Sequence, residues 1–135
     1  RFMISLEEGV KLVWHAFEDM VGGEIYVKKI PSMKVTDLAR VVAPECKQEV
    51  VGIRPGEKLH EMMCPGDMSY HTYEFDDHFV IAPAIKFFNR SNDFSSNALQ
   101  EQGKLVTPGF QYVSDTNPDF LSVEQMRQFN QEAML

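Results

Sequence analysis

Apolar side chains recur at steps of three and four over the start of the chain, which is the spacing of one face of an α-helix. The recurring residues are Leu6, Val10, Val13, Trp14, Phe17 and Met20. Residues 5–8 (Ser-Leu-Glu-Glu) have the form of a capping box, which satisfies backbone donors at a helix start. Gly22 and Gly23 end the pattern, because glycine readily adopts the left-handed conformation that terminates a helix. We expect a first helix whose Trp14 and nearby phenylalanines belong to the core.

The next segments alternate between strand and helix patterns. In chain order, they predict a strand at 24–30, a helix at 35–43, a strand at 49–53 and a short helix at 57–63. Pro31 and Pro44 close the first two of these elements. The resulting αβαβα order predicts an α/β fold and favours parallel strands with helices packed on them, because parallel neighbours need crossover connections.

Beyond residue 66 the pattern weakens and predicts a loop-rich tail with short strands. Candidate strands lie at 79–82 and 110–113. Residues 122–125 (Ser-Val-Glu-Gln) offer a second capping box, for a final helix that reaches about residue 133.

Composition and charge narrow the classes of function. The 135 residues fit one domain, and 44% hydrophobic residues suffice for a core. A formal charge of −7, with its 13 basic residues scattered, argues against nucleic acid and anionic membranes as partners. No apolar run approaches the ~20 residues needed to span a bilayer. Two cysteines and no secretory leader predict a soluble cytoplasmic protein without a disulfide. The chain begins at Arg1 without a starting methionine, which indicates a cut.

Residues 51–61 form the most informative stretch, because a predicted strand there delivers Arg54 into a turn that opens a predicted helix. A guanidinium offers a planar fork of donors that matches phosphate, and a helix start adds unpaired N–H groups. Glu57 is then placed to accept hydrogen bonds from ribose hydroxyls. The alternative is an exposed turn in which Arg54 is solvated and Glu57 is a first-turn charge.

Other polar residues suggest chemistry less specifically. His60 and Cys64 would share a helix face, and His71 and His78 follow, but their spacing matches no established zinc pattern. We therefore predict no metal site. Two further groups invite an acid–base proposal, but we interpret both as solvated faces. These groups are Glu57 with Glu61, and Asp76 and Asp77 with His78. No nucleophilic triad, Walker loop or dinucleotide fingerprint occurs in the sequence.

Six strings of residues carry a family resemblance. They are 1–8 (RFMISLEE), 23–27 (GEIYV), 30–39 (IPSMKVTDLA), 53–61 (IRPGEKLHE), 74–81 (EFDDHFVI) and 109–112 (GFQY). Together they resemble the inverting UDP-N-acetylglucosamine 4,6-dehydratases, extended short-chain dehydrogenase/reductases of the polysaccharide biosynthesis family. The similarity extends over nearly all of the chain.

The resemblance implies that residues 1–135 are the carboxyl-terminal, substrate-binding part of a Rossmann-type enzyme. In such enzymes NADP takes hydride from C4 of the sugar, water leaves across C5 and C6, and hydride returns to C6 with inversion at C5. The product is a 4-keto-6-deoxy sugar nucleotide for bacterial surface glycans, as in pseudaminic acid synthesis. The resemblance gives Arg54 a contact with the UDP diphosphate and Glu57 a contact with the uridine ribose. It leaves Lys58, His60 and Glu61 to positioning and packing.

The resemblance also implies that the NADP-binding Rossmann half, with its acid–base residues and Tyr/Lys pair, is absent from this chain. We therefore expect no catalytic residue, no cofactor-binding residue and no bound cofactor, so that the chain is inactive alone. Its expected partners are a UDP-sugar, the missing Rossmann half and further copies of itself. Self-association is expected because loss of that half would expose the apolar faces of the first helix and of the parallel strands.

Two alternatives stay open at the level of sequence. The first is a free-standing nucleotide-sugar binding or assembly module without catalysis. The second is part of a related epimerase or retaining dehydratase, since the residues that decide the reaction lie outside this chain. Residues 54–61 favour the inverting dehydratases within the resemblance.

Overall fold

The computed structural model describes residues 1–85 and 93–133. The chain divides into two compact units, each of which draws on separate stretches of sequence. Unit 1 comprises residues 1–6, 30–61 and 113–135, and unit 2 comprises residues 7–29 and 62–112. No helix among the described residues has the length and apolarity needed to cross a bilayer. Both cysteines are free thiols, and Cys46 is exposed whereas Cys64 is buried.

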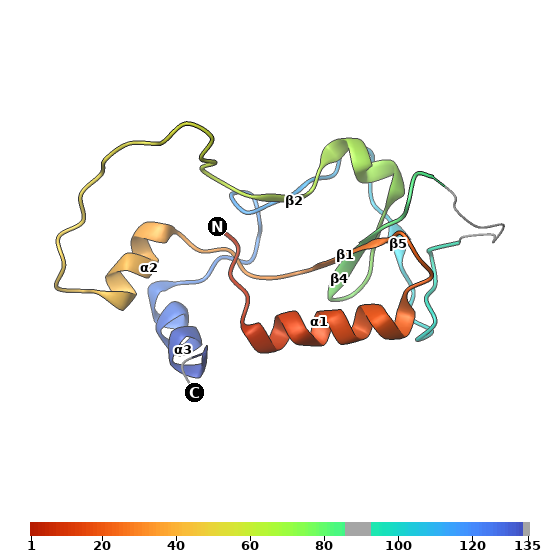
Figure 1. Cartoon of the computed structure of the whole chain (residues 1–135), viewed down its shortest axis with the longest axis horizontal. Coiled ribbons are helices and arrows are strands. Elements are labelled where there is room, and N and C mark those ends of the chain that lie inside the picture. Colours follow the sequence, from red (N-terminus) through yellow and green to blue (C-terminus); the bar gives the residue numbers. More distant parts are fainter. Residues whose placement is uncertain (86–92, 134–135) are drawn as a thin grey trace. The chain divides into compact units, whose positions relative to one another are not determined.

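Unit 2 is built on a four-stranded sheet with the order β1-β4-β3-β5, of which β1, β4 and β5 are labelled in Figure 1. Its strands are β1 (Ile25–Lys28), β3 (Thr72–Glu74), β4 (His78–Ile81) and β5 (Lys104–Leu105). Every neighbouring pair is antiparallel, so the expectation of parallel strands was wrong. A short turn joins β3 to β4, and such a hairpin needs no crossover helix. The sheet confirms the strands predicted at 24–30 and 79–82, although β1 is shorter than predicted.

The central strand β4 is buried along its whole length. Because side chains alternate across a strand, His78 and Val80 lie on one face of the sheet and Phe79 on the other. Phe79 packs against Phe110 and Tyr112, with ring centroids 5.2 and 5.1 Å away. Phe79 therefore belongs to an aromatic core on one face of the sheet, whereas the buried His78 lies on the opposite face.

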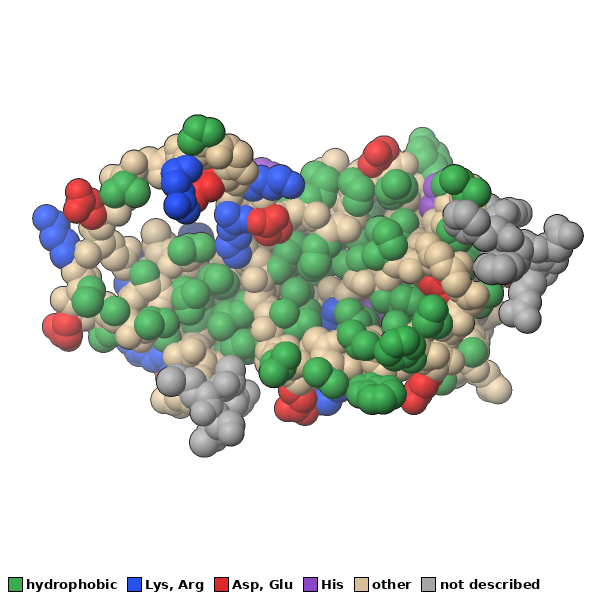
Figure 2. Space-filling model, viewed as in Figure 1, with side chains coloured by type: hydrophobic (Ala, Val, Ile, Leu, Met, Phe, Trp, Pro, Cys, Tyr) green, Lys and Arg blue, Asp and Glu red, His purple; other side chains and the backbone are tan. Residues whose placement is uncertain are grey.

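Helix α1 (Leu6–Asp19) begins directly after Ser5, as the capping box predicted, and ends before the two glycines. Its apolar face is exposed, with Trp14 at 64% and Phe17 at 65% accessibility, so the expectation that these rings are core was wrong. Figure 2 shows hydrophobic side chains gathered over α1. Periodicity tells which side chains share a face, but not which face meets the sheet. The face that meets it carries His15 and Asp19.

Unit 1 contains α2 (Val35–Val42) and α3 (Val123–Ala133), which pack on each other. Both helices were predicted, and the second capping box is present. Ser122 N–H donates to Gln125 Oε1 at 2.8 Å, and Gln125 N–H donates to Ser122 Oγ at 3.3 Å. Met126 of α3 is fully buried.

Buried polar side chains tie the non-helical segments of unit 1 together. Ser32 is fully buried, and its backbone N–H donates to the Asp119 carbonyl at 2.8 Å. The Asn117 amide donates to Ser32 Oγ at 3.0 Å and to the Ile30 carbonyl at 2.9 Å. Each of these polar groups has a partner, as a buried position requires.

Two predicted elements are wrong, namely the strand at 49–53 and the helix at 57–63. Val50 and Val51 are 93% and 89% exposed, and Gly52 has a positive φ of 87° that interrupts an extended run. At Lys58 and Glu61 the backbone groups bond residues that are distant in sequence, so no ladder of i to i+4 bonds forms. Ser114 provides one such partner, because its Oγ accepts from Glu61 N–H at 2.9 Å.

The chain becomes regular again at strand β2 (Met62–Cys64), which pairs with β6 (Tyr112–Val113) in a two-stranded sheet. β6 lies within the strand predicted at 110–113. A 3-10 helix, η1 (Gly66–His71), follows β2. The sequence pattern missed η1, β3 and β5, which are all short.

Candidate functional site

The stretch that the sequence singled out folds as a turn in unit 1. Glu57 N–H donates to the Arg54 carbonyl at 3.1 Å and closes it. Gly56 has a φ of 84°, in the left-handed region where a glycine is favoured. The turn therefore depends on Gly56 and on a local hydrogen bond, and no helix follows to add its dipole to an anion site.

Arg54 and Glu57 are brought together, but they bond each other. The Arg54 Nε and Nη2 atoms donate to Glu57 Oε1 at 2.9 and 2.6 Å, and Arg54 N–H donates to Glu57 Oε2 at 2.8 Å. These bonds from Arg54 hold the pKa of the Glu57 carboxyl below its usual value. The Arg54 side chain is 85% exposed, so solvent screens the pair. Contact of either residue with a nucleotide stays a prediction.

Glu57 lies on the edge of an open groove of about 710 Å³ within unit 1. The polar side chains that line it are those of Arg1, Lys34, Thr36, Glu57, Lys58, His60, Ser114 and Asp115. Three of them are permanently basic and two are carboxylates, so the lining has a positive balance in a chain of net charge −7. Arg54 is not one of the described residues that line this groove.

The remaining residues of the motif fix its backbone. The Arg1 guanidinium donates to the Lys58 carbonyl at 2.5 Å and forms an ion pair with Glu61. His60 Nδ1 lies 3.5 Å from an Asp115 carboxylate oxygen. These contacts connect the turn to distant parts of unit 1, which is the kind of role expected for Lys58, His60 and Glu61.

The histidines weighed as metal ligands do not share a helix. His71 is exposed in η1, whereas Cys64 is buried in β2 and its burial raises the pKa of the thiol to about 12. His78 is 1% exposed, so its interpretation as part of a solvated face was wrong. The structure instead brings His78 together with His15 and Glu101, whose possible ligand atoms all lie within 4.8 Å of one another. Sequence reasoning missed this group, and its one local signal was the neighbouring Asp77 and His78.

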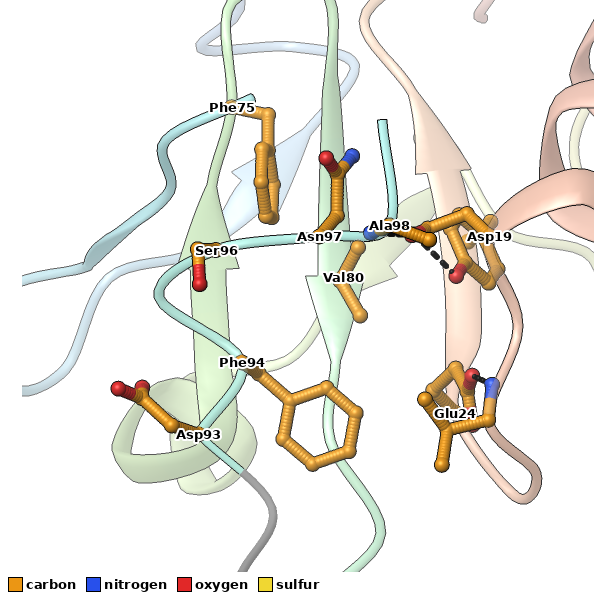
Figure 3. A pocket seen from close by; sticks show the side chains of 11 residues that line it. Asp19, Glu24, Phe75, Val80, Asp93, Phe94, Ser96, Asn97 and Ala98 are labelled. Carbon is orange, nitrogen blue, oxygen red and sulfur yellow. Dashed lines mark hydrogen bonds between the residues drawn. The ribbon is translucent and has the colours of Figure 1, made fainter. Parts of the chain in front are cut away.

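A cavity of about 170 Å³ opens on the sheet face that carries His78 and Val80, between β1, β4 and residues 93–98 (Figure 3). Asp19 lines it and is buried, accepting a hydrogen bond from Tyr26 at 2.6 Å and from Ala98 N–H at 2.8 Å. Burial, together with the bond to Asp19, raises the pKa of the Tyr26 phenol. This network anchors the 93–101 segment to α1 and β1.

Comparison with known proteins now places this mixed α/β chain in a family. The family described as "Polysaccharide biosynthesis protein" matches residues 1–83, and the chain belongs to it. Among curated relatives, the inverting UDP-N-acetylglucosamine 4,6-dehydratase of Campylobacter jejuni subsp. jejuni serotype O:2 is 54% identical over 126 residues. That alignment covers 93% of this chain and 38% of the relative. The family resemblance stated from the residues alone is therefore confirmed.

Two more distant relatives define the breadth of the similarity. The UDP-glucose 4-epimerase of Rickettsia canadensis is 31% identical over 85 residues, which cover 60% of this chain and 25% of the relative. The X-ray structure of Pen from Bacillus thuringiensis superposes with a TM-score of 0.75 at 27% identity, covering 99% of this chain and 38% of that one. The chain thus spans well under half the length of these relatives.

Proposed function

We propose that this chain is the UDP-sugar-binding portion of an inverting UDP-N-acetylglucosamine 4,6-dehydratase and has no dehydratase activity by itself. The observation that carries the proposal is the 54% identity over 93% of the chain, which includes the 53–61 string. In the complete enzyme NADP would carry the hydride between C4 and C6 of the sugar. The 4-keto-6-deoxy product would enter surface-glycan synthesis in the bacterial cytoplasm, as in a pseudaminic acid pathway.

The geometry of unit 1 supports a role in anion binding. The groove beside Glu57 is within the range of volumes typical of small-molecule sites, and its lining has a positive balance. A diphosphate would exchange the Arg54–Glu57 pair for a bidentate Arg54–phosphate contact. The released Glu57 carboxylate would then be free to accept hydrogen bonds from the ribose hydroxyls.

The exposed apolar face of α1 supports the second half of the proposal, that the chain works with further protein. Leu6, Trp14 and Phe17 are each more than 60% exposed, and neighbouring apolar residues extend the patch along the helix. Patches of this kind mark interaction surfaces. We infer that the part of the dehydratases beyond this chain covers α1, and that copies of the isolated chain associate through it.

Calorimetric titration with UDP tests the nucleotide site. We expect weak saturable binding, because much of the contact surface would lie outside this chain. Arg54→Ala should weaken it by at least about tenfold, since hydrogen bonds to charged groups are worth about 1.5–3 kcal/mol. Arg127→Ala is the matched control, because Arg127 also pairs with a carboxylate three residues away on an exposed surface. UDP affinity that is equal in the wild type and Arg54→Ala would refute the assignment.

Sedimentation tests the α1 surface separately. Trp14→Glu should shift the chain toward the monomer, because it places a charge in the apolar patch. Val51→Glu is the control, since Val51 is 89% exposed but lies outside α1. A monomeric wild-type chain at all concentrations would contradict self-association and leave the UDP test unaffected.

An epimerase is the second candidate, and the 31% identity to the Rickettsia canadensis protein favours it over other classes. Both candidates would bind the UDP moiety, so UDP alone does not separate them. Joined to the remainder of its enzyme, this chain should release a 4-keto sugar from UDP-N-acetylglucosamine if it belongs to a dehydratase. Interconversion of C4 epimers without water loss would identify the epimerase, and UDP binding without either reaction in the joined protein would indicate a free-standing module.

A further inference from the structure

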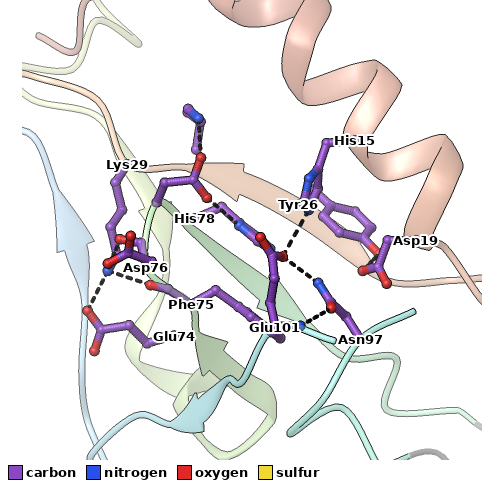
Figure 4. A network of polar contacts seen from close by, with 12 residues as sticks. His15, Asp19, Tyr26, Lys29, Glu74, Phe75, Asp76, His78, Asn97 and Glu101 are labelled. Atoms are coloured by element: carbon purple, nitrogen blue, oxygen red, sulfur yellow. Dashed lines mark hydrogen bonds and ion pairs between the residues drawn. The ribbon is translucent and has the colours of Figure 1, made fainter. Parts of the chain in front are cut away.

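Unit 2 contains a cluster of imidazole and carboxylate groups, centred on the buried His78, that the proposed function does not use. Its members come from three separate elements: His15 from α1, His78 from β4 and Glu101 from the segment before β5 (Figure 4). The possible ligand atoms of the three side chains lie within 4.8 Å of one another. The rings of His15 and His78 are 4.7 Å apart between centroids and meet edge to face.

The environment of His78 leaves one ring nitrogen as a free acceptor. Asp77 Oδ1 lies 2.8 Å from His78 Nδ1, and an ionised carboxylate can only accept, so Nδ1 carries the hydrogen. The lone pair of neutral His78 is therefore on Nε2. Phe75 stacks on the ring at 4.7 Å and holds its orientation.

Both Nε2 atoms of the cluster are buried and lack a hydrogen-bond partner among the described residues. Buried polar atoms are normally satisfied, so two adjacent exceptions require an explanation. His78 is 1% exposed and His15 is half-buried, and one ring nitrogen of each lies within 4.8 Å of a Glu101 carboxylate oxygen. The nearest Glu101 oxygen lies 3.7 Å from His15 Nε2, which is too far for a hydrogen bond.

The Glu101 carboxylate is positioned by its own turn. Asn97 Nδ2 donates to Glu101 Oε2 at 2.6 Å, and Glu101 N–H donates back to Asn97 Oδ1 at 2.8 Å. The adjacent Ala98 is held by its bond to buried Asp19 of α1. Figure 4 shows the Glu101 carboxylate between the His15 ring and Asn97. The helix that supplies His15 therefore also fixes the turn that supplies Glu101.

We propose that His15 Nε2, His78 Nε2 and a Glu101 carboxylate oxygen bind a divalent transition-metal ion, with Zn²⁺ the ion of best fit. Two imidazoles favour zinc-like ions over Mg²⁺ and Ca²⁺, which prefer oxygen ligands. Two histidines and one glutamate make up a known zinc ligand set, with water in the fourth position. Asp77 acts behind His78 as the carboxylate that orients a ligating imidazole.

The geometry requires only a small adjustment. Ligand atoms on a tetrahedral zinc are about 3.3 Å apart, so the cluster has to contract by no more than about 1.5 Å. Glu101 is able to move, because its side chain is 45% exposed, whereas His78 is fixed in the core. A bound ion would join α1, β4 and the 97–101 turn at one point. It would therefore be a structural element of unit 2.

The test is a titration of the chelator-treated 135-residue chain with ZnCl₂, followed by calorimetry, and with CoCl₂, followed by visible absorption. We expect one ion per chain, the ligand-field bands of four-coordinate Co²⁺, and a rise of several degrees in Tm with zinc. Glu101→Gln and His15→Gln should each weaken zinc binding by at least about tenfold, and Asp77→Asn by a smaller factor. None of these changes removes a large apolar side chain from the core, so the variants should fold.

The controls are other side chains that could bind zinc but lie outside the cluster. His60→Gln, His71→Gln and Cys46→Ser should leave zinc affinity unchanged. Absence of saturable binding in the wild type would overturn the proposal, as would equal affinity in Glu101→Gln and His15→Gln. Either result would mean that the Nε2 atoms of His15 and His78 are hydrogen-bonded by water, or that His15 and Glu101 form an ordinary ion pair. Because the UDP titration concerns residues of unit 1, its outcome is independent of this one.

Discussion

The Arg54–Glu57 turn of unit 1 and the His15–His78–Glu101 cluster of unit 2 differ in how they are built. The turn is local, exposed and satisfied within itself, because arginine and glutamate bond each other. The cluster joins three distant stretches, includes a fully buried imidazole and leaves two ring nitrogens without partners in the part of the chain that the structure describes. A recognisable sequence motif therefore need not be a preformed binding site, and side chains that the fold brings together need not form a motif in the sequence.

The largest effect on stability is expected from Gly103→Ala, which would displace the Phe75 ring that packs on His78 of the cluster. A Cβ atom at this position would lie 2.5 to 2.9 Å from three ring atoms of Phe75, the ring that stacks on His78. We expect a loss of about 3 kcal/mol in unfolding free energy, as for overpacked cores, measured by urea denaturation.

Gly9→Ala and Gly56→Ala are the controls for a steric effect at Gly103, because no described atom lies within 4 Å of a Cβ at Gly9 or Gly56. Gly9→Ala in α1 should stabilise by up to about 1 kcal/mol through helix propensity. Gly56→Ala should cost about 1 kcal/mol because of its positive φ. Equal stability of Gly103→Ala and wild type would show that the cluster is not rigidly supported.

Tyr26→Phe tests the anchor of the 93–101 segment. The change removes a 2.6 Å hydrogen bond to the buried Asp19 carboxylate, which keeps the bond from the Ala98 N–H. We expect a loss of about 2 kcal/mol in unfolding free energy, because the acceptor is charged. Hydrogen exchange at the Ala98 amide should also accelerate. Unchanged exchange there would indicate that the segment is held independently of α1.

The pH dependence of stability tests the orientation of His78. The pKa of the Asp77 carboxyl is about 2 in the folded chain, below its unfolded value of 3.8. The contribution of ionised Asp77 to the unfolding free energy is therefore complete above about pH 4. It is lost as the pH falls through 2. Because the side chain is 57% exposed, solvent screening limits the effect to less than about 1 kcal/mol. Urea denaturation between pH 5 and pH 2 should show a smaller decline for Asp77→Asn, and identical profiles would contradict the arrangement.

The smallest effect on stability is expected from Arg54→Ala. The Arg54–Glu57 pair is exposed, and such pairs contribute at most about 0.5–1 kcal/mol. We expect the unfolding free energy to change by less than about 0.5 kcal/mol, measured by the same urea method. A larger loss would show that Arg54 maintains the fold, and the reduced UDP affinity of this variant would then need a structural explanation.

The parts of the fold that periodicity predicted are those with local causes. α1 and α3 follow from spacing and capping boxes, α2 from spacing, and β1 and β4 from runs of β-branched and aromatic residues. The helix predicted at 57–63 fails because Arg1 and Ser114, both distant in sequence, take the backbone groups of that stretch. Short elements such as β5 depend on pairing with a neighbour and carry no pattern of their own.

The same distinction applies to the sites. The proximity of Arg54 and Glu57 was predictable because three residues separate them in one turn. The cluster was not, because only the sheet and helix α1 bring His15, His78 and Glu101 together. The orientation of α1 was unpredictable for a related reason: its apolar stripe faces away from the sheet of its own unit.

The most direct measurement of the central claim is a titration of the ¹⁵N-labelled chain with UDP, observed by NMR. We expect saturable shifts that centre on the amides of residues 52–60 and on the groove around Lys34 and Asp115. The amides around His15 and Glu101 should stay unchanged. No saturable shift at a large excess of UDP, or shifts that centre on unit 2, would contradict the claim that Arg54 and Glu57 belong to a uridine diphosphate site.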